Sequence, residues 1–178
     1  VQEAVELVME AFEIAERYRN PVLVMGDGII GQMMEPVEFP ERKVAEPEKP
    51  WATTGCRGRR PNVVKSLLLD PARLEEHNHK LADKYARMKR EEVRVETEGL
   101  EEAEVVICAY GTTSRICRTA MNTLREEGVK VGLIRPITLF PFPERTIREL
   151  DPGKAKAILT VEMSLGQLVE DVKRYNEG

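Results

Sequence analysis

A glycine followed by three hydroxyl residues stands where an apolar run gives way to a helical pattern. Gly111, Thr112, Thr113 and Ser114 come directly after the apolar stretch that ends at Tyr110. Free backbone N–H groups and the helix dipole at the start of a helix can bind an anion. We therefore predict these four residues as candidate anion contacts. Their commoner role is to cap the helix without any ligand, as Thr112 or Ser114 can do.

A second polar group follows another apolar run, Ala157–Val161. Glu162 closes this run, and Ser164 and Gln167 have the spacing of a capping box at the start of the last helix. The carboxyl ends of parallel strands meet at one edge of a sheet, where open α/β sheets bind ligands. These three residues are therefore candidate contacts at the same edge. No Ser/His/Asp set accompanies them, and no histidine that could act as a general base stands at a strand end.

A glycine-rich turn, Gly26–Gly31, matches the Gly-x-Gly-x-x-Gly pattern of dinucleotide-binding proteins and follows an apolar run, Pro21–Met25. That pattern must open a long helix. Pro36 and Pro40 prevent such a helix here, so nucleotide binding is disfavoured. The turn is still predicted to lie at the carboxyl end of a buried strand, Pro21–Met25. Two residues of the turn, Asp27 and Gly28, and Gln32 directly after it remain candidate loop contacts.

Histidine and cysteine residues give no metal-ligand pattern. His77 and His79 are two residues apart in a predicted helix and so point to different sides. Cys56, Cys108 and Cys117 show no Cys-x-x-Cys spacing, so neither a metal nor an iron–sulfur site is predicted. An odd number of cysteines without a secretory signal indicates a reducing, cytoplasmic compartment.

The charge balance excludes several classes of partner. The formal net charge is −4, and charged residues make up 33% of the chain, so nothing drives it toward nucleic acid or an anionic membrane. No apolar run approaches the roughly 18 residues of a membrane span. The basic cluster Gly55–Arg60 lacks interleaved aromatic residues. It is predicted as a solvated turn, with an anion or subunit contact as the alternative.

The N-terminal half predicts helices separated by a long connection. Residues 1–18 form an amphipathic helix with no cap residue before it, which indicates a truncated N-terminus. Residues 37–61 are rich in proline and charge, as interdomain linkers are. Asp70 and Pro71 predict the start of a long polar helix that ends near Arg90. We expect residues 1–40 to be the remnant of one α/β domain, and 41–91 to be a linker and bridging helix.

Residues 92–178 predict a domain of alternating strands and helices. Three apolar, β-branched runs, separated by helical patterns, predict strand–helix–strand–helix–strand–helix. Crossovers of this kind give a mostly parallel sheet with helices outside, a three-layer α/β/α architecture. Val93–Glu96 is predicted as a short edge strand.

Several stretches together resemble one family. Val131–Pro143 reads Val-Gly-Leu-Ile-Arg-Pro-Ile-Thr-Leu-Phe-Pro-Phe-Pro, and Val161–Val172 reads Val-Glu-Met-Ser-Leu-Gly-Gln-Leu-Val-Glu-Asp-Val. With Ala-Tyr-Gly-Thr-Thr at Ala109–Thr113, these resemble a transketolase C-terminal-type domain, more closely that of the alpha subunit of 2-oxoacid:ferredoxin oxidoreductases. Phe12–Asp27 resembles the end of that subunit's pyrimidine-binding domain. Gly28–Val37 is most similar to the 2-oxoisovalerate type.

The resemblance implies an enzyme in which thiamine diphosphate attacks a 2-oxoacid and carbon dioxide leaves. Iron–sulfur clusters then pass electrons to ferredoxin, and coenzyme A takes the acyl group. It implies that the thiamine-activating glutamate precedes Val1, and that the diphosphate, magnesium and cluster sites belong to other subunits. The chain, as a fragment of a longer alpha subunit, would then carry no catalytic residue of its own and bind no cofactor alone. It would assemble with the beta and other subunits, with Gly111–Ser114 and Glu162–Gln167 facing a neighbouring domain or subunit.

Two other functions remain open at this point. The chain could be a stand-alone module that binds an anion or nucleotide through Gly26–Gly31 or Gly111–Ser114. It could also be the C-terminal domain of a different thiamine enzyme, such as one of the transketolase type.

Overall fold

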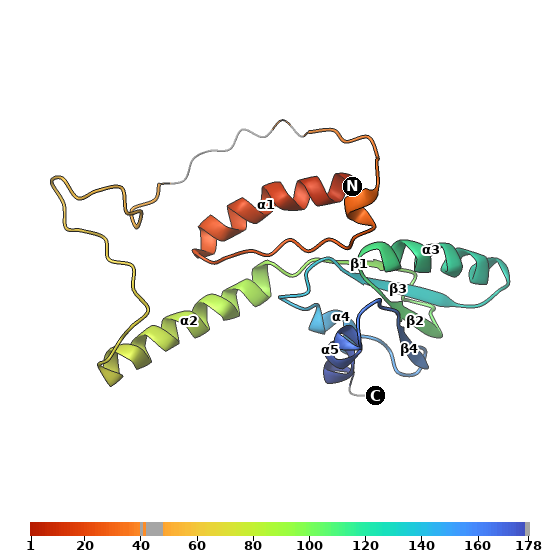
Figure 1. Ribbon diagram of the computed structural model, residues 1–178. Helices are drawn as coiled ribbons and strands as arrows, with labels where there is room; N and C mark the ends of the chain where they lie inside the picture. The colour runs from red at the N-terminus through yellow and green to blue at the C-terminus, as the bar shows by residue number, and fades with distance from the viewer. Residues whose placement is uncertain (40, 42–47, 177–178) are drawn as a thin grey trace.

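The computed structural model describes residues 1–39, 41 and 48–176 (Figure 1). Its elements are α1 (Gln2–Tyr18), the short 3-10 helix η1 (Ile30–Gln32), α2 (Pro71–Glu91), β1 (Val95–Glu98), β2 (Val105–Cys108), α3 (Gly111–Glu126), β3 (Val131–Pro136), α4 (Glu144–Arg148), β4 (Ala157–Thr160) and α5 (Gln167–Tyr175).

The four strands form one sheet in the order β1-β3-β2-β4. β2 is the central strand of the parallel part and pairs with β3 on one side and β4 on the other. β1 runs antiparallel to β3, with Glu96 opposite Arg135. The predicted α/β fold with three parallel strands is therefore confirmed. The predicted edge strand is also present, shifted two residues toward the C-terminus.

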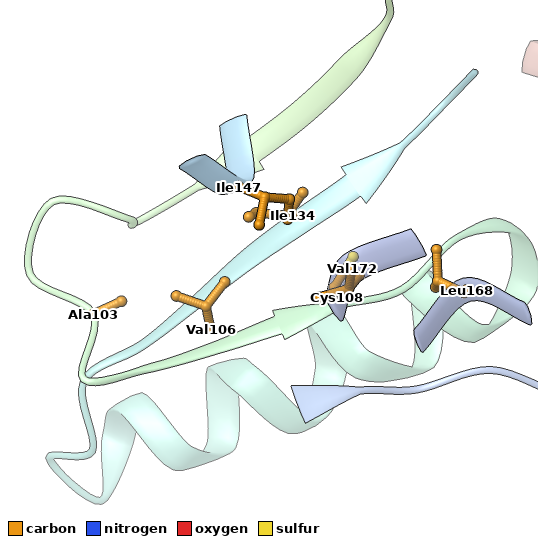
Figure 2. Close-up of a cluster of buried hydrophobic side chains, with 7 residues drawn as sticks. All are labelled: Ala103, Val106, Cys108, Ile134, Ile147, Leu168 and Val172. Carbon is orange, nitrogen blue, oxygen red and sulfur yellow. The ribbon is translucent and has the colours of Figure 1, made fainter. Parts of the chain in front are cut away.

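The alternation of side chains along the central strands builds a core on both faces of the sheet. Val106 and Cys108 point toward α4 and α5, where they meet Ile147 and Leu168 in one buried cluster (Figure 2). Val131, Leu133 and Ile107 point the other way, toward α3, and pack against two of its residues, Cys117 and Met121. Helices on both faces make the three layers that the sequence predicts (Figure 1).

The predicted strand Pro21–Met25 is wrong. The segment is extended but belongs to no sheet, and the Leu23 side chain is 82% exposed. Its composition suits a buried strand, but a strand forms only when a neighbouring backbone accepts and donates its hydrogen bonds. Among the described residues no strand lies beside it.

The long polar helix begins as predicted. The Asp70 side chain accepts a hydrogen bond from the backbone N–H of Arg73 at 2.9 Å, and Pro71 is the first helical residue. α2 extends away from the sheet (Figure 1), and its one buried residue is Met88. Between Glu48 and Asp70 the chain forms no helix or strand, while Pro40 and residues 42–47 of the predicted linker lie outside the described residues.

The sequence predicts neither a membrane span nor a metal site. In the described part of the chain, no helix combines the length and apolar composition that crossing a lipid bilayer demands. The same residues contain no group of three or more potential metal-ligating side chains.

Candidate functional site

The first candidate group starts α3, where the backbone turns sharply from β2. Gly111 has a φ of 57°, a left-handed conformation that costs glycine little and other residues much more. Thr113 and Ser114 are buried behind it. The Ser114 hydroxyl donates a hydrogen bond to the carbonyl oxygen of Gly111 at 2.7 Å, so it braces the turn from inside.

Asp27 lies against the start of α3, although it comes from the glycine-rich turn near the N-terminus. A Cβ atom at Gly111 would stand 3.8 Å from Oδ2 of Asp27. The backbone N–H of Ile30 donates to Oδ1 of the same carboxylate at 2.8 Å. This hydrogen bond is the main cause that lowers the pKa of Asp27, and the Thr112 side chain is the second. The structure therefore brings together two candidate groups that the sequence leaves separate. Gly28 of the same turn and Gln32 directly after it are exposed.

The second candidate group surrounds the start of α5, which Glu162 caps. Its carboxylate accepts hydrogen bonds from the backbone N–H groups of Leu168 and Val169, both at 3.0 Å, and from the Ser164 hydroxyl. Burial alone would raise the pKa of Glu162, but the Ser164 hydroxyl and these N–H groups outweigh it and lower the pKa. A charged carboxylate is thus fixed at the positive end of the helix.

The predicted capping box of Ser164 and Gln167 is wrong. Gly166, with a φ of 98°, is the N-cap residue, so Gln167 begins the helix and Ser164 lies outside it. Ser164 instead links the two candidate groups, because its hydroxyl stands 3.4 Å from the hydroxyl of Tyr110, the residue before α3.

The buried thiol nearest to this edge is held in its neutral form. Burial raises the pKa of Cys108 to about 12, and the negative charge of Glu162 adds to the effect. Cys108 is fully buried in the hydrophobic cluster, where a thiol packs as a small apolar side chain.

At this edge of the sheet, each of the two helix starts already has a carboxylate of the chain itself beside it. These are Asp27 at α3 and Glu162 at α5. The sequence singled out both acids as contacts but did not predict that Glu162 caps α5 or that Asp27 lies beside the start of α3. Glu162 stands six or more residues before the N–H groups it binds, which is outside any local capping pattern.

Replacing Glu162 with glutamine is expected to lower the free energy of unfolding by about 1 kcal/mol at neutral pH, because the charge at the helix start is lost. The pKa of Glu162 is depressed in the folded chain, so this contribution is present above the unfolded pKa. It disappears as the pH falls through the folded pKa. Urea unfolding at several pH values measures the effect.

Glu76→Gln is the matched control for this change. Glu76 lies beyond the first turn of α2 and pairs at the surface with Lys80, with both side chains more than half exposed. We expect it to cost at most about 0.5 kcal/mol. A Glu162→Gln variant no less stable than this control would contradict the capping role.

Comparison with known families divides the chain into two parts. Residues 1–101 match the model for the thiamine diphosphate-binding domain of pyruvate flavodoxin/ferredoxin oxidoreductases. Residues 103–178 match the model for core domain II of pyruvate:ferredoxin oxidoreductase. The chain belongs to the 2-oxoacid:ferredoxin oxidoreductase family. The family resemblance stated from the sequence is thereby confirmed.

Curated relatives in this family include ketoisovalerate oxidoreductase subunits. The VorB subunit of Methanothermobacter marburgensis is 50% identical over 97% of this chain and 49% of the relative. That of Methanothermobacter thermautotrophicus is 51% identical over the same shares. The 2-oxoglutarate synthase subunit KorA of Methanocaldococcus jannaschii is 35% identical over 98% of this chain and 53% of the relative. The chain therefore spans about half the length of these relatives.

A solved structure in the same family shares the fold. The 2-oxoglutarate:ferredoxin oxidoreductase from Magnetococcus marinus, with 2-oxoglutarate, coenzyme A and succinyl-CoA bound, matches with a TM-score of 0.55 and 28% identity. The match covers 62% of this chain and 19% of that one.

Proposed function

We propose that this chain is part of the alpha subunit of a thiamine-diphosphate-dependent 2-oxoacid:ferredoxin oxidoreductase that acts on 2-oxoisovalerate. In the overall reaction the 2-oxoacid loses carbon dioxide, its acyl group is joined to coenzyme A, and two electrons pass to ferredoxin. The observation that carries the proposal is the match of the whole chain to two consecutive domain models of this family. The choice of 2-oxoisovalerate as the substrate rests on sequence identity. The chain is 50–51% identical to ketoisovalerate oxidoreductase subunits and 35% identical to a 2-oxoglutarate synthase subunit.

We propose that the described residues form no complete thiamine diphosphate site of their own. A diphosphate with its magnesium ion requires carboxylate or amide ligands and free backbone donors. The described residues contain no metal-ligand cluster, and both helix starts at the sheet edge face the chain's own carboxylates. We propose that the cofactor, the magnesium ion and the iron–sulfur clusters are bound by other parts of the complex. This chain would then serve its assembly.

We propose a role for each of three parts of the chain. Residues 1–40 complete a pyrimidine-binding-type domain, 41–91 connect the two domains, and 92–178 form the transketolase C-terminal-like domain. Gly111–Ser114 and Glu162–Gln167 would face a neighbouring domain or subunit at the exposed sheet edge. Three free thiols and the absence of a membrane-crossing helix among the described residues support a cytoplasmic location.

Activity of the assembled complex tests the function. The full-length alpha subunit, co-produced with its partner subunits, is expected to reduce ferredoxin or a viologen dye with 2-oxoisovalerate only when coenzyme A is present. We expect kcat/KM for 2-oxoisovalerate to exceed that for 2-oxoglutarate or pyruvate by at least about tenfold. Faster turnover of 2-oxoglutarate would contradict the substrate, and inactivity with every 2-oxoacid would contradict the enzyme class.

A further inference from the structure

Helix α1 carries a line of charged residues that faces the C-terminal domain. Glu3, Glu10 and Arg17 are spaced seven residues apart, which is close to two helical turns, so they lie along one side of α1. Each forms an ion pair with a residue at the end of α2 or in the sheet domain. The three pairs are Glu3–Arg135, Glu10–Arg94 at 2.6 Å and Arg17–Glu92 at 2.9 Å. We call these three pairs the ionic seam.

The segment that follows α1 contacts the same domain in the same way. Oε1 of Glu35 pairs with Arg115 of α3 at 2.8 Å. The Asp27 carboxylate lies at the start of that helix, beside Gly111. Every one of these contacts between residues 1–39 and the C-terminal domain is polar.

Apolar packing takes little part in this interface. Both hydrophobic clusters are formed entirely by residues 95–175. Of the described residues 1–39, only Tyr18 is buried, and it packs against α2, where the Arg87 guanidinium lies 4.6 Å from its ring centre. Phe12 of α1 is 71% exposed. Leu7 and Ile14 share this side of α1 with the charged residues and are half-buried, but neither packs against the hydrophobic clusters of the domain. The side-chain contacts of α1 with the domain described above are therefore ionic.

The residues on the domain side of the seam keep a second partner of their own. Arg135 also pairs with Glu96 at 2.8 Å, its neighbour across the β1–β3 ladder. Arg94 also approaches the buried carboxylate of Glu92, at 3.5 Å. Arg135, Arg94 and Glu92 therefore each keep a partner of opposite charge when α1 moves away. Opening the seam leaves no buried charge unpaired.

We propose that the ionic seam sets the orientation of the C-terminal domain relative to α1, and that raised ionic strength releases it while the domain stays folded. Five of the six seam side chains are 17–53% exposed, whereas Glu92 is 5% exposed. Salt weakens exposed ion pairs more than buried ones, so the Glu3–Arg135 and Glu10–Arg94 pairs are expected to respond most as the Debye length falls from about 10 Å at about 0.1 M to about 3 Å at about 1 M. The clusters that hold the domain together consist of uncharged side chains, so screening of charge does not weaken them. Polar interfaces between domains permit relative motion as a rule.

Energy transfer between two dyes tests the proposal in the full chain. Dyes are attached to cysteines introduced at Val8 on α1 and at Arg145, an exposed residue of α4, with Cys56 replaced by serine. Transfer efficiency is expected to change as NaCl rises from about 0.1 M to about 1 M, while the far-ultraviolet circular dichroism of the chain stays constant. A transfer efficiency that is the same at both salt concentrations overturns the proposal.

A charge reversal separates the seam from general salt effects. In the Glu10→Arg variant, which places an arginine opposite Arg94, we expect the high-salt transfer efficiency already at low salt. The matched control is Glu6→Arg, the same change one turn away at an exposed position, where the carboxylate accepts a hydrogen bond from Gln2 of α1 itself. The control should retain the low-salt value of the parent chain. Equal behaviour of the two variants also overturns the proposal, whichever 2-oxoacid the complex uses.

Discussion

Replacing Met121 with alanine is expected to lower the free energy of unfolding of this chain by about 2–5 kcal/mol. Met121 is fully buried in α3 and packs in the cluster that joins this helix to β2 and β3. Removing its side chain loses apolar burial and leaves a cavity between helix and sheet, which the rigid strands cannot close. Urea unfolding followed by circular dichroism measures the change.

Met34→Ala is the control, because it deletes the same atoms from a side chain that is 99% exposed. Surface changes of this kind stay within about 0.5 kcal/mol. Equal losses of stability in the two variants would show that α3 does not pack on the sheet as described.

Replacing Gly132 with valine is expected to lower the free energy of unfolding by about 1–3 kcal/mol through overpacking. Gly132 lies in β3, where a Cβ atom would stand 3.0 Å from the Ala103 side chain, 3.0 Å from the Gly99 carbonyl oxygen and 3.0 Å from the Leu100 side chain. The backbone oxygen cannot move aside without displacing the turn that leads into β2. Thermal unfolding of the purified variant gives the size of the loss.

Gly31→Val provides the comparison for this prediction. Gly31 lies in η1, and nothing stands within 4 Å of the Cβ atom it would gain. We expect its cost to stay near 0.5 kcal/mol. A Gly132→Val variant as stable as Gly31→Val would contradict the close approach of the β1–β2 connection to β3.

The C-terminal fold could be predicted because its signals are local. The apolar runs and the helical spacing between Glu104 and Pro136 define a strand, a helix and a strand. Asp70 and Pro71 mark the start of α2 within two adjacent residues. Each pattern involves residues that are close together in the chain, so its prediction does not depend on contacts with distant parts of the fold.

The failed predictions depend on distant partners. Pro21–Met25 has the composition of a strand, but strand formation is decided by a neighbouring strand that the segment itself cannot specify. The Asp27 contact with the start of α3 joins residues that are far apart in the chain. Likewise, the apolar stripe of α1 predicts which side is buried, whereas its contacts with the domain are made by Glu3 and Glu10.

The order of strands in the sheet also bears on how the chain folds. β2 and β3 are adjacent in the sheet and are joined by α3, so this unit closes with contacts that are short in sequence. Contacts of low sequence separation lose the least chain entropy when they form. We therefore expect β2, α3 and β3 to form the folding nucleus, with β1 and β4 added to its two sides afterwards.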